Sequence, residues 1–277
     1  MKALVLEGGG MRGTYTAGVL DCFLDYNVKF DYVIGTSAGA TSGLSFLSGQ
    51  KGRTRFSNID LLKIHNYVGL KSLLFGGGLI DLHFLFDIYP NKYYPFDFTA
   101  YSKSPARFIA VSTNALTGKP VYLEEKNDFP RFLEVCRASC SLPMVTPITW
   151  VDNMPLVDGG VSDSIPFLKA MQDGADEIVV VLTKPRGYRK PNKLSRLPWF
   201  LLRKYPELRN ALIHRNIDYN KQIELLEKLE DEGKIKVIRP SSDCGVTRTS
   251  DNTSNLQSLY DLGYKEGTSF IKFSSIH

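Results

Sequence analysis

The chain has 277 residues, of which 43% are hydrophobic, 12% aromatic and 23% charged. This composition excludes a mostly disordered protein and supplies enough apolar side chains for a substantial core. No apolar run approaches the length of about 20 residues that a membrane-spanning helix needs. The net charge of +5 is mild, and we expect one domain with an insertion over residues 1–277.

Two apolar runs near the N-terminus, residues 3–6 and 32–34, have the length and the β-branched content of buried strands. Each run is followed by a glycine-rich corner and then by a helix-like pattern, which ends near Asn27 in the first case and near Leu47 in the second. The chain is therefore predicted to begin as strand, turn and helix, twice over. Because the first strand begins within three residues of Met1, we expect no signal peptide and a cytoplasmic protein.

From about residue 61 to residue 104 the sequence becomes rich in aromatic residues and is interrupted by glycines, as in Phe75-Gly76-Gly77-Gly78. The stretch is either an ordinary connection with one or two helices or a cap over a site. We favour the cap, because so much apolar surface in a long connection must cover something.

The remaining elements alternate between strands and helices. Strands are predicted at 107–112, 119–123, 148–151, 155–157, 177–182 and 235–238, and helices at 131–139, 219–229 and 256–272. The strands at 148–151 and 155–157 form a hairpin that turns at Asp152-Asn153. This alternation predicts an α/β fold with a mainly parallel sheet covered by helices on both faces.

Ser37 lies in the second glycine corner, within Gly35-Thr36-Ser37-Ala38-Gly39. The pattern G-x-S-x-G is typical of a serine on a sharp strand-to-helix bend, where Gly35 and Gly39 avoid the clashes that β-carbons would cause. The hydroxyl of Ser37 is therefore predicted to be exposed as a nucleophile.

The first glycine corner contains Gly8, Gly9, Gly10, Arg12 and Gly13. It also fits the dinucleotide-binding pattern G-x-G-x-x-G, but the acid expected at the end of the second strand is missing, and the lysine of a phosphate-binding loop is missing too. An oxyanion hole explains the corner better, because N–H groups without neighbouring side chains can converge on a developing negative charge. Arg12 either adds a fixed positive charge that steers an anionic head group or forms a salt bridge that locks the loop.

A serine nucleophile needs a base. None of the four histidines, His65, His83, His214 and His277, lies in a sequence typical of a catalytic loop. Asp158 follows a predicted strand and precedes Gly159 and Gly160, an arrangement that exposes an acid at the end of a strand. Asp152 is better placed as a turn residue.

Four motifs in order resemble the patatin-like phospholipases. They are G-G-G-x-R-G at 8–13, G-T-S-A-G at 35–39, A-S-C-S-L-P at 138–143, and D-G-G at 158–160 followed by Pro166, and they extend over about residues 1–185. The resemblance implies a three-layer α/β/α fold and a Ser-Asp dyad without histidine, acting on acyl esters of lipids through an acyl-enzyme. It assigns Ser37 as the nucleophile and Asp158 as the base. The part from 186 to 277 carries no motif of this family.

Three other functions stay open beside a lipid acyl hydrolase. A soluble carboxylesterase or thioesterase could use the same dyad, and a non-catalytic lipid-binding module could retain the same pocket. A catalytic-triad α/β hydrolase fits less well, because Ser37 follows only the second predicted strand. No cofactor is predicted. The four cysteines are too few and too irregular for a disulfide framework, and Cys136 and Cys140 are interpreted as a buried pair and not as metal ligands.

Residues 184–215, called the basic segment below, contain ten Lys or Arg residues and the single acid Glu207, a local charge of +9. Its cations are interleaved with Trp199, Phe200 and leucines, as in segments that lie at membrane interfaces. Peripheral contact with an anionic membrane and a merely solvated surface both fit this pattern. No nucleic-acid-binding motif accompanies the charge, so no nucleic acid partner is expected.

Overall fold

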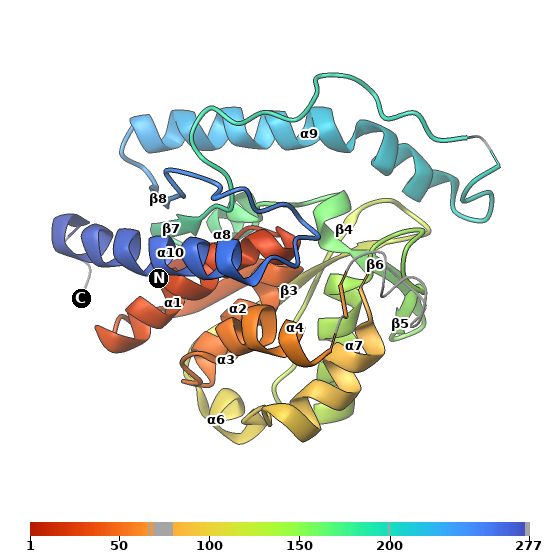
Figure 1. Cartoon of the computed structure of the whole chain (residues 1–277). Coiled ribbons are helices and arrows are strands. Elements are labelled where there is room, and N and C mark those ends of the chain that lie inside the picture. The colour runs from red at the N-terminus through yellow and green to blue at the C-terminus, as the bar shows by residue number, and fades with distance from the viewer. Residues whose placement is uncertain (66, 69–79, 199, 275–277) are drawn as a thin grey trace.

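The structure, a computed structural model, describes residues 1–65, 67–68, 80–198 and 200–274 (Figure 1). Within these residues eight strands form one sheet in the order β5-β6-β3-β2-β1-β7-β8, with β4 also paired to β3. The strands are β1 (Lys2–Leu6), β2 (Tyr32–Thr36), β3 (Arg107–Asn114), β4 (Pro120–Leu123), β5 (Thr149–Val151), β6 (Met154–Asp158), β7 (Glu177–Val181) and β8 (Lys236–Ile238). The run β8-β7-β1-β2-β3 is parallel, and β4, β5 and β6 pair in antiparallel fashion.

Alternate residues of the central strands enter two separate cores, because successive side chains of a strand point to opposite faces. In β1, Leu4 and Leu6 belong to one core, and Ala3 and Val5 belong to the other. The two cores lie on opposite faces of the sheet. Both faces are therefore buried, as the continuous apolar runs of these strands predict.

Helices cover both faces. One core includes α1 (Gly13–Asp25), α2 (Ala38–Leu47), α7 (Phe129–Cys140) and α10 (Thr253–Ser274), and the other includes α8 (Phe167–Gln172) and α9 (Pro206–Asp231). In Figure 1, α9 lies across the top of the view, above the strands, while α1, α2 and α10 lie below it. The predicted three-layer α/β/α fold around a mainly parallel sheet is confirmed.

The segment between α2 and β3 contains short helical pieces. They are α3 (Arg53–Arg55), η2 (Phe56–Asp60), α4 (Leu61–Ile64), η3 (Phe84–Tyr93) and α6 (Phe98–Lys103). Aromatic rings join the last of these pieces to α7, since Phe98 of α6 packs against Phe132 with ring centroids 5.2 Å apart. The motif at 75–78 lies outside the described residues.

Two helices differ from the sequence-based expectation. The short helix α8 was not predicted, and α9 begins at Pro206 rather than near Tyr219. The first half of α9 is rich in polar residues and buries few side chains, chiefly Leu208 and Leu212, which pack on Val157 and Val161. With so few apolar residues, this half shows no helical periodicity in the sequence, and tertiary contacts stabilise the helix there.

The C-terminal part packs closely on the N-terminal part. Strand β8 pairs with β7, and α10 packs along α1. At this contact Gly18 of α1 lies so close to the carbonyl of Tyr260 that a β-carbon would clash, and Gly263 of α10 lies equally close to the carbonyl of Tyr15. Glycines at these positions let the two helix backbones approach each other.

Candidate active site

Strands β2 and β6 lie on the same edge of β3 and meet at their carboxyl ends. Thr36, the last residue of β2, pairs with Val111, and Asp158, the last residue of β6, pairs with the next residue, Ser112. The opposite edge of β3 is occupied by β4 at both positions. This register brings Ser37 and Asp158 together at one point of the sheet.

Ser37 has a backbone conformation that L-residues rarely adopt, with φ of 55° and ψ of −122°. Such a residue persists only where its surroundings fix it, and the strain costs on the order of 1–3 kcal/mol. The bend needs its glycines, because a β-carbon on Gly39 would lie 2.5 Å from the Leu6 carbonyl oxygen, and one on Gly35 would lie 2.7 Å from the Ala40 nitrogen. The structure thus contains the strand-to-helix bend that the pattern predicts.

Ser139 holds this bend in place. Its Oγ accepts a hydrogen bond from the Ser37 N–H at 2.9 Å and donates one to the Val111 carbonyl at 2.7 Å. Ser139 therefore ties the serine bend to β3. In the sequence Ser139 stands within the motif A-S-C-S-L-P, and nothing in its local pattern indicates this contact over 102 positions.

Asp158 is buried, with 2% of its surface exposed. Its N–H donates to the Ser141 carbonyl at 2.7 Å, and its Oδ1 accepts from the Gly160 N–H at 2.7 Å. Its Oδ2 is also buried and has no hydrogen-bond partner among the described residues. One oxygen thus fixes the carboxylate, and the other is available as a proton acceptor.

The glycine corner at 8–13 offers fewer free N–H donors for an oxyanion hole than its sequence suggests. The Gly8 N–H donates to the Ser164 carbonyl at 3.2 Å, and the Gly13 N–H donates to the Gly10 carbonyl within the turn η1 (Gly10–Arg12). Within the part of the chain that the structure describes, no hydrogen bond is found from the N–H groups of Gly9 or Gly10. These two N–H groups are the available donors of this corner.

Arg12 is 9% exposed, and no ion pair of its guanidinium is found among the described residues. Its buried Nε also lacks a hydrogen-bond partner there. Burial, and next the charge of Arg248, lower the pKa of Arg12. The salt bridge that is one of the two interpretations of Arg12 is therefore not found within the described residues.

A pocket extends from Ser37, and its empty space is about 950 Å³ including the open mouth. Its walls are mostly apolar and come from the start of α2, residues 53–58, residues 80–96 and α7, with Leu82, Phe86 and Tyr89 among the lining residues. Arg53 also lines it, 8% exposed and stacked over the Tyr89 ring at 4.7 Å. Cys136 and Cys140 line the pocket as free thiols.

The three described histidines have other contacts. His65 stacks on Phe84, His83 contacts Asp87 at 2.7 Å, and His214 contacts the Asn210 carbonyl at 2.9 Å. His277 lies outside the described residues. Over those residues no group of three or more His, Cys, Asp or Glu side chains is arranged to hold a metal ion.

The comparison with protein families shows where the chain belongs. The model of the patatin-like phospholipases matches residues 4–171, so the chain belongs to the patatin-like phospholipase family. Residues 205–273 match a second model, described as a domain of unknown function, DUF6363.

The relatives of this chain are distant. The uncharacterized protein YjjU of Escherichia coli K12 is 29% identical over 284 residues, which cover 97% of this chain and 76% of YjjU. Lysophospholipase NTE1 of Meyerozyma guilliermondii is 27% identical over 94% of this chain, but the match covers only 18% of that protein. VipD from Legionella pneumophila shares the fold, with a TM-score of 0.52 at 13% identity over 98% of this chain and 66% of VipD.

Proposed function

We propose that this protein is a serine hydrolase that cleaves acyl esters of phospholipids with a Ser37-Asp158 dyad. The observation that supports the proposal is the meeting of β2 and β6 on one edge of β3, where the strained Ser37 and the buried Asp158, which has one unpartnered oxygen, follow and end these two strands. Membership of the patatin-like phospholipase family supports the reaction class.

The reaction proceeds by two acyl transfers. Asp158 Oδ2 takes the proton of the Ser37 hydroxyl, and Ser37 Oγ attacks the ester carbonyl. The N–H groups of Gly9 and Gly10 stabilise the tetrahedral oxyanion, and one such donor is worth about 2.7–4 kcal/mol of barrier. The alcohol leaves with a proton from Asp158, and water, activated by the same carboxylate, then releases the fatty acid from Ser37.

The pocket beside Ser37 suits an acyl chain, because its walls are mostly apolar. Residues 80–96 form much of this wall, which supports their assignment, with the rest of the 61–104 segment, as a cap over the site. A relative named lysophospholipase supports a single-chain phospholipid as the substrate.

We also propose peripheral contact with anionic membranes through the exposed part of the basic segment. Lys193 and Arg196 are exposed there, and the apolar side chains of Leu194 and Phe200 are 49% and 58% exposed. The +9 of the whole segment overstates its surface charge, because Lys184, Arg186 and Arg189 form ion pairs with acids outside it. Trp199 lies outside the described residues. Over the described part of the chain, no helix has the length and apolarity to cross a bilayer.

The test is fatty-acid release from a lysophospholipid and from a soluble short-chain ester. The wild type is expected to hydrolyse both, and Ser37→Ala to lose about 10³-fold or more of each activity. Ser42→Ala, one turn further along α2, is the matched control and keeps its activity. Hydrolysis of the short-chain ester alone would favour the soluble esterase, and full activity of Ser37→Ala would refute the dyad.

A further inference from the structure

Four cations gather behind the glycine corner, three of them from the C-terminal part of the chain. We call Arg12, Lys190, Arg215 and Arg248 the basic cluster. Arg12 ends η1, Lys190 lies in the connection after β7, Arg215 lies on α9, and Arg248 lies between β8 and α10. Residues 215 and 248 fall within the DUF6363 region, to which no function is assigned.

Two direct contacts place these C-terminal residues at the site. The Arg248 carbonyl accepts a hydrogen bond from the Met11 N–H at 3.0 Å, next to Gly10. Arg215 Nε donates to the Gly160 carbonyl at 2.6 Å, and the N–H of Gly160 holds Asp158 Oδ1. The C-terminal part thus contacts the glycine corner at 8–13 and the D-G-G motif at 158–160.

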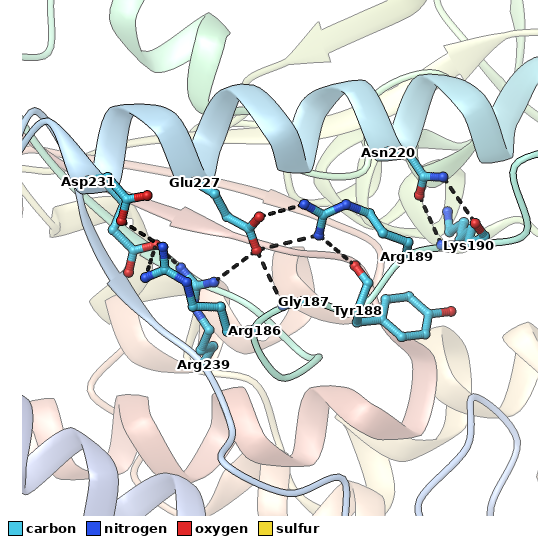
Figure 2. A network of polar contacts seen from close by, with 10 residues as sticks. Arg186, Gly187, Tyr188, Arg189, Lys190, Asn220, Glu227, Asp231 and Arg239 are labelled. Carbon is cyan, nitrogen blue, oxygen red and sulfur yellow. Dashed lines mark hydrogen bonds and ion pairs between the residues drawn. The ribbon is translucent and has the colours of Figure 1, made fainter.

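Lys190 is fixed by α9. Its backbone N–H donates to Asn220 Oδ1 at 2.9 Å, and its Nζ lies 3.7 Å from the centroid of the Tyr219 ring. Figure 2 shows that ion pairs hold the residues just before Lys190 to the same helix, as between Arg189 and Glu227 of α9. Lys190 is therefore held in position against a rigid element.

The cations of this cluster lack anionic partners. Among the described residues no ion pair is found for any of the four, and the buried Arg12 Nε and Lys190 Nζ have no hydrogen-bond partner. Three of the described acids lie near the cluster without forming an ion pair to it: Asp158 near Arg215, Asp243 near Arg12, and Glu7. The Glu7 carboxylate already accepts from the Tyr219 hydroxyl at 2.9 Å and from the Thr183 N–H at 2.6 Å. Buried cations without partners are costly, and a bound anion would offset that cost.

The pKa values show how close the charges lie to one another. Burial first, and then the positive charges of Arg215 and Arg248, lower the pKa of Lys190 to about 6. Burial lowers the pKa of Arg215 to about 10, and the charge of Arg248 is the next cause. An anion in contact with these groups would relieve their mutual repulsion.

We propose that the basic cluster is a phosphate-binding subsite beside the dyad. Guanidinium groups bind phosphate oxygens in a bidentate manner, and a tetrahedral dianion offers enough acceptors for several cations at once. The phosphate is either the head group of the lipid substrate or free phosphate. The head-group form rests on the proposed lipid hydrolase function, whereas phosphate binding itself does not.

The test compares the double variant Lys190→Met/Arg248→Gln with the wild type. The matched control, Lys221→Gln/Lys228→Gln, removes two exposed cations from α9. Inorganic phosphate is titrated calorimetrically at constant ionic strength. Steady-state kinetics are measured with a single-chain phosphomonoester lipid below its micelle concentration and with an uncharged short-chain ester.

The wild type and the control are expected to bind phosphate equally, and the double variant to bind it about tenfold or more weakly. A parallel rise in KM for the phosphomonoester lipid, with the uncharged ester unaffected, identifies the head group as the ligand. Weaker phosphate binding without that rise identifies free phosphate. Absence of phosphate binding by the wild type, or equal loss in the control, overturns the subsite, and the calorimetric result is readable even if no ester is hydrolysed.

Discussion

The two parts of the chain contribute to the site in different ways. In residues 1–185 the geometry comes from the backbone: glycines that allow close approach, a strained serine, and two strands that end on the same edge of β3. In residues 186–277 the contribution comes from separate charged side chains on three different elements. In the function proposed above, the first part cleaves the bond and the second recognises charge.

This comparison explains why the first part carries motifs and the second does not. A glycine in a crowded turn has a fixed spacing from its neighbours, so the requirement appears in the sequence as a pattern. A cation reaches its site with a long side chain from any of several backbones, so Lys190, Arg215 and Arg248 form no pattern. The packing of β8 and α10 on the N-terminal part leads us to propose that residues 1–277 form a single hydrolase domain.

The largest loss after that of the nucleophile is expected from Asp158→Asn. The amide retains the shape of the carboxylate but cannot accept the Ser37 proton, so kcat is expected to fall by about 10²–10⁴-fold. His83→Ala and His214→Ala are the controls and keep most of the activity. The measurement is kcat for ester hydrolysis, with circular dichroism to verify folding. A similar loss of kcat in a folded histidine variant would show that the base is misassigned.

Gly39→Ala tests whether the site in the first part depends on backbone approach. A β-carbon would lie 2.5 Å from the Leu6 carbonyl, so α2 must shift and move Ser37 away from Asp158. A displacement of about 1 Å can cost on the order of 10²-fold in rate. Gly267→Ala on α10, where a β-carbon would meet its nearest neighbour at an ordinary contact distance of 3.4 Å, is the control. Equal activities of the two variants would contradict the close-packing argument.

A smaller effect is expected from Ser139→Ala, which removes the acceptor of the Ser37 N–H. A hydrogen bond of this kind contributes about 0.5–1.5 kcal/mol, so kcat is expected to fall by roughly tenfold or less while KM stays nearly constant. Ser139 acts here as a positioning residue. Rescue by Ser139→Thr would support that role, and a change confined to KM would argue against it.

The smallest effect on catalysis is expected from Lys193→Gln/Arg196→Gln in the basic segment. Each cation near an anionic surface contributes about 1 kcal/mol, and salt screens this attraction within about 10 Å at 0.1 M. Co-sedimentation with anionic vesicles should weaken in the variant and at high salt, while hydrolysis of a soluble ester is unchanged. Lys221→Gln/Lys228→Gln is the control. Equal binding to anionic and zwitterionic vesicles would leave the segment as an ordinary solvated surface.

Local patterns in the sequence predicted the central strands, the bend at Ser37 and the hairpin that ends at Asp158. They could not predict that β6 pairs with β3 directly beyond the end of β2, because the register of strands far apart in the sequence is decided by tertiary packing. For the same reason, the sequence could not predict the hydrogen bond from the Gly8 N–H to the Ser164 carbonyl. The polar first half of α9 gave no helical apolar pattern, so Arg215 could not be placed at the site.

The central claim is that Ser37 is the nucleophile that Asp158 activates, and labelling with a fluorophosphonate tests it most directly. The modified residue is mapped by peptide mass spectrometry in the wild type and in Asp158→Asn. We predict a single adduct on Ser37 in the wild type, formed much more slowly in Asp158→Asn. An adduct on another serine, or equal labelling rates in the two proteins, would contradict the dyad.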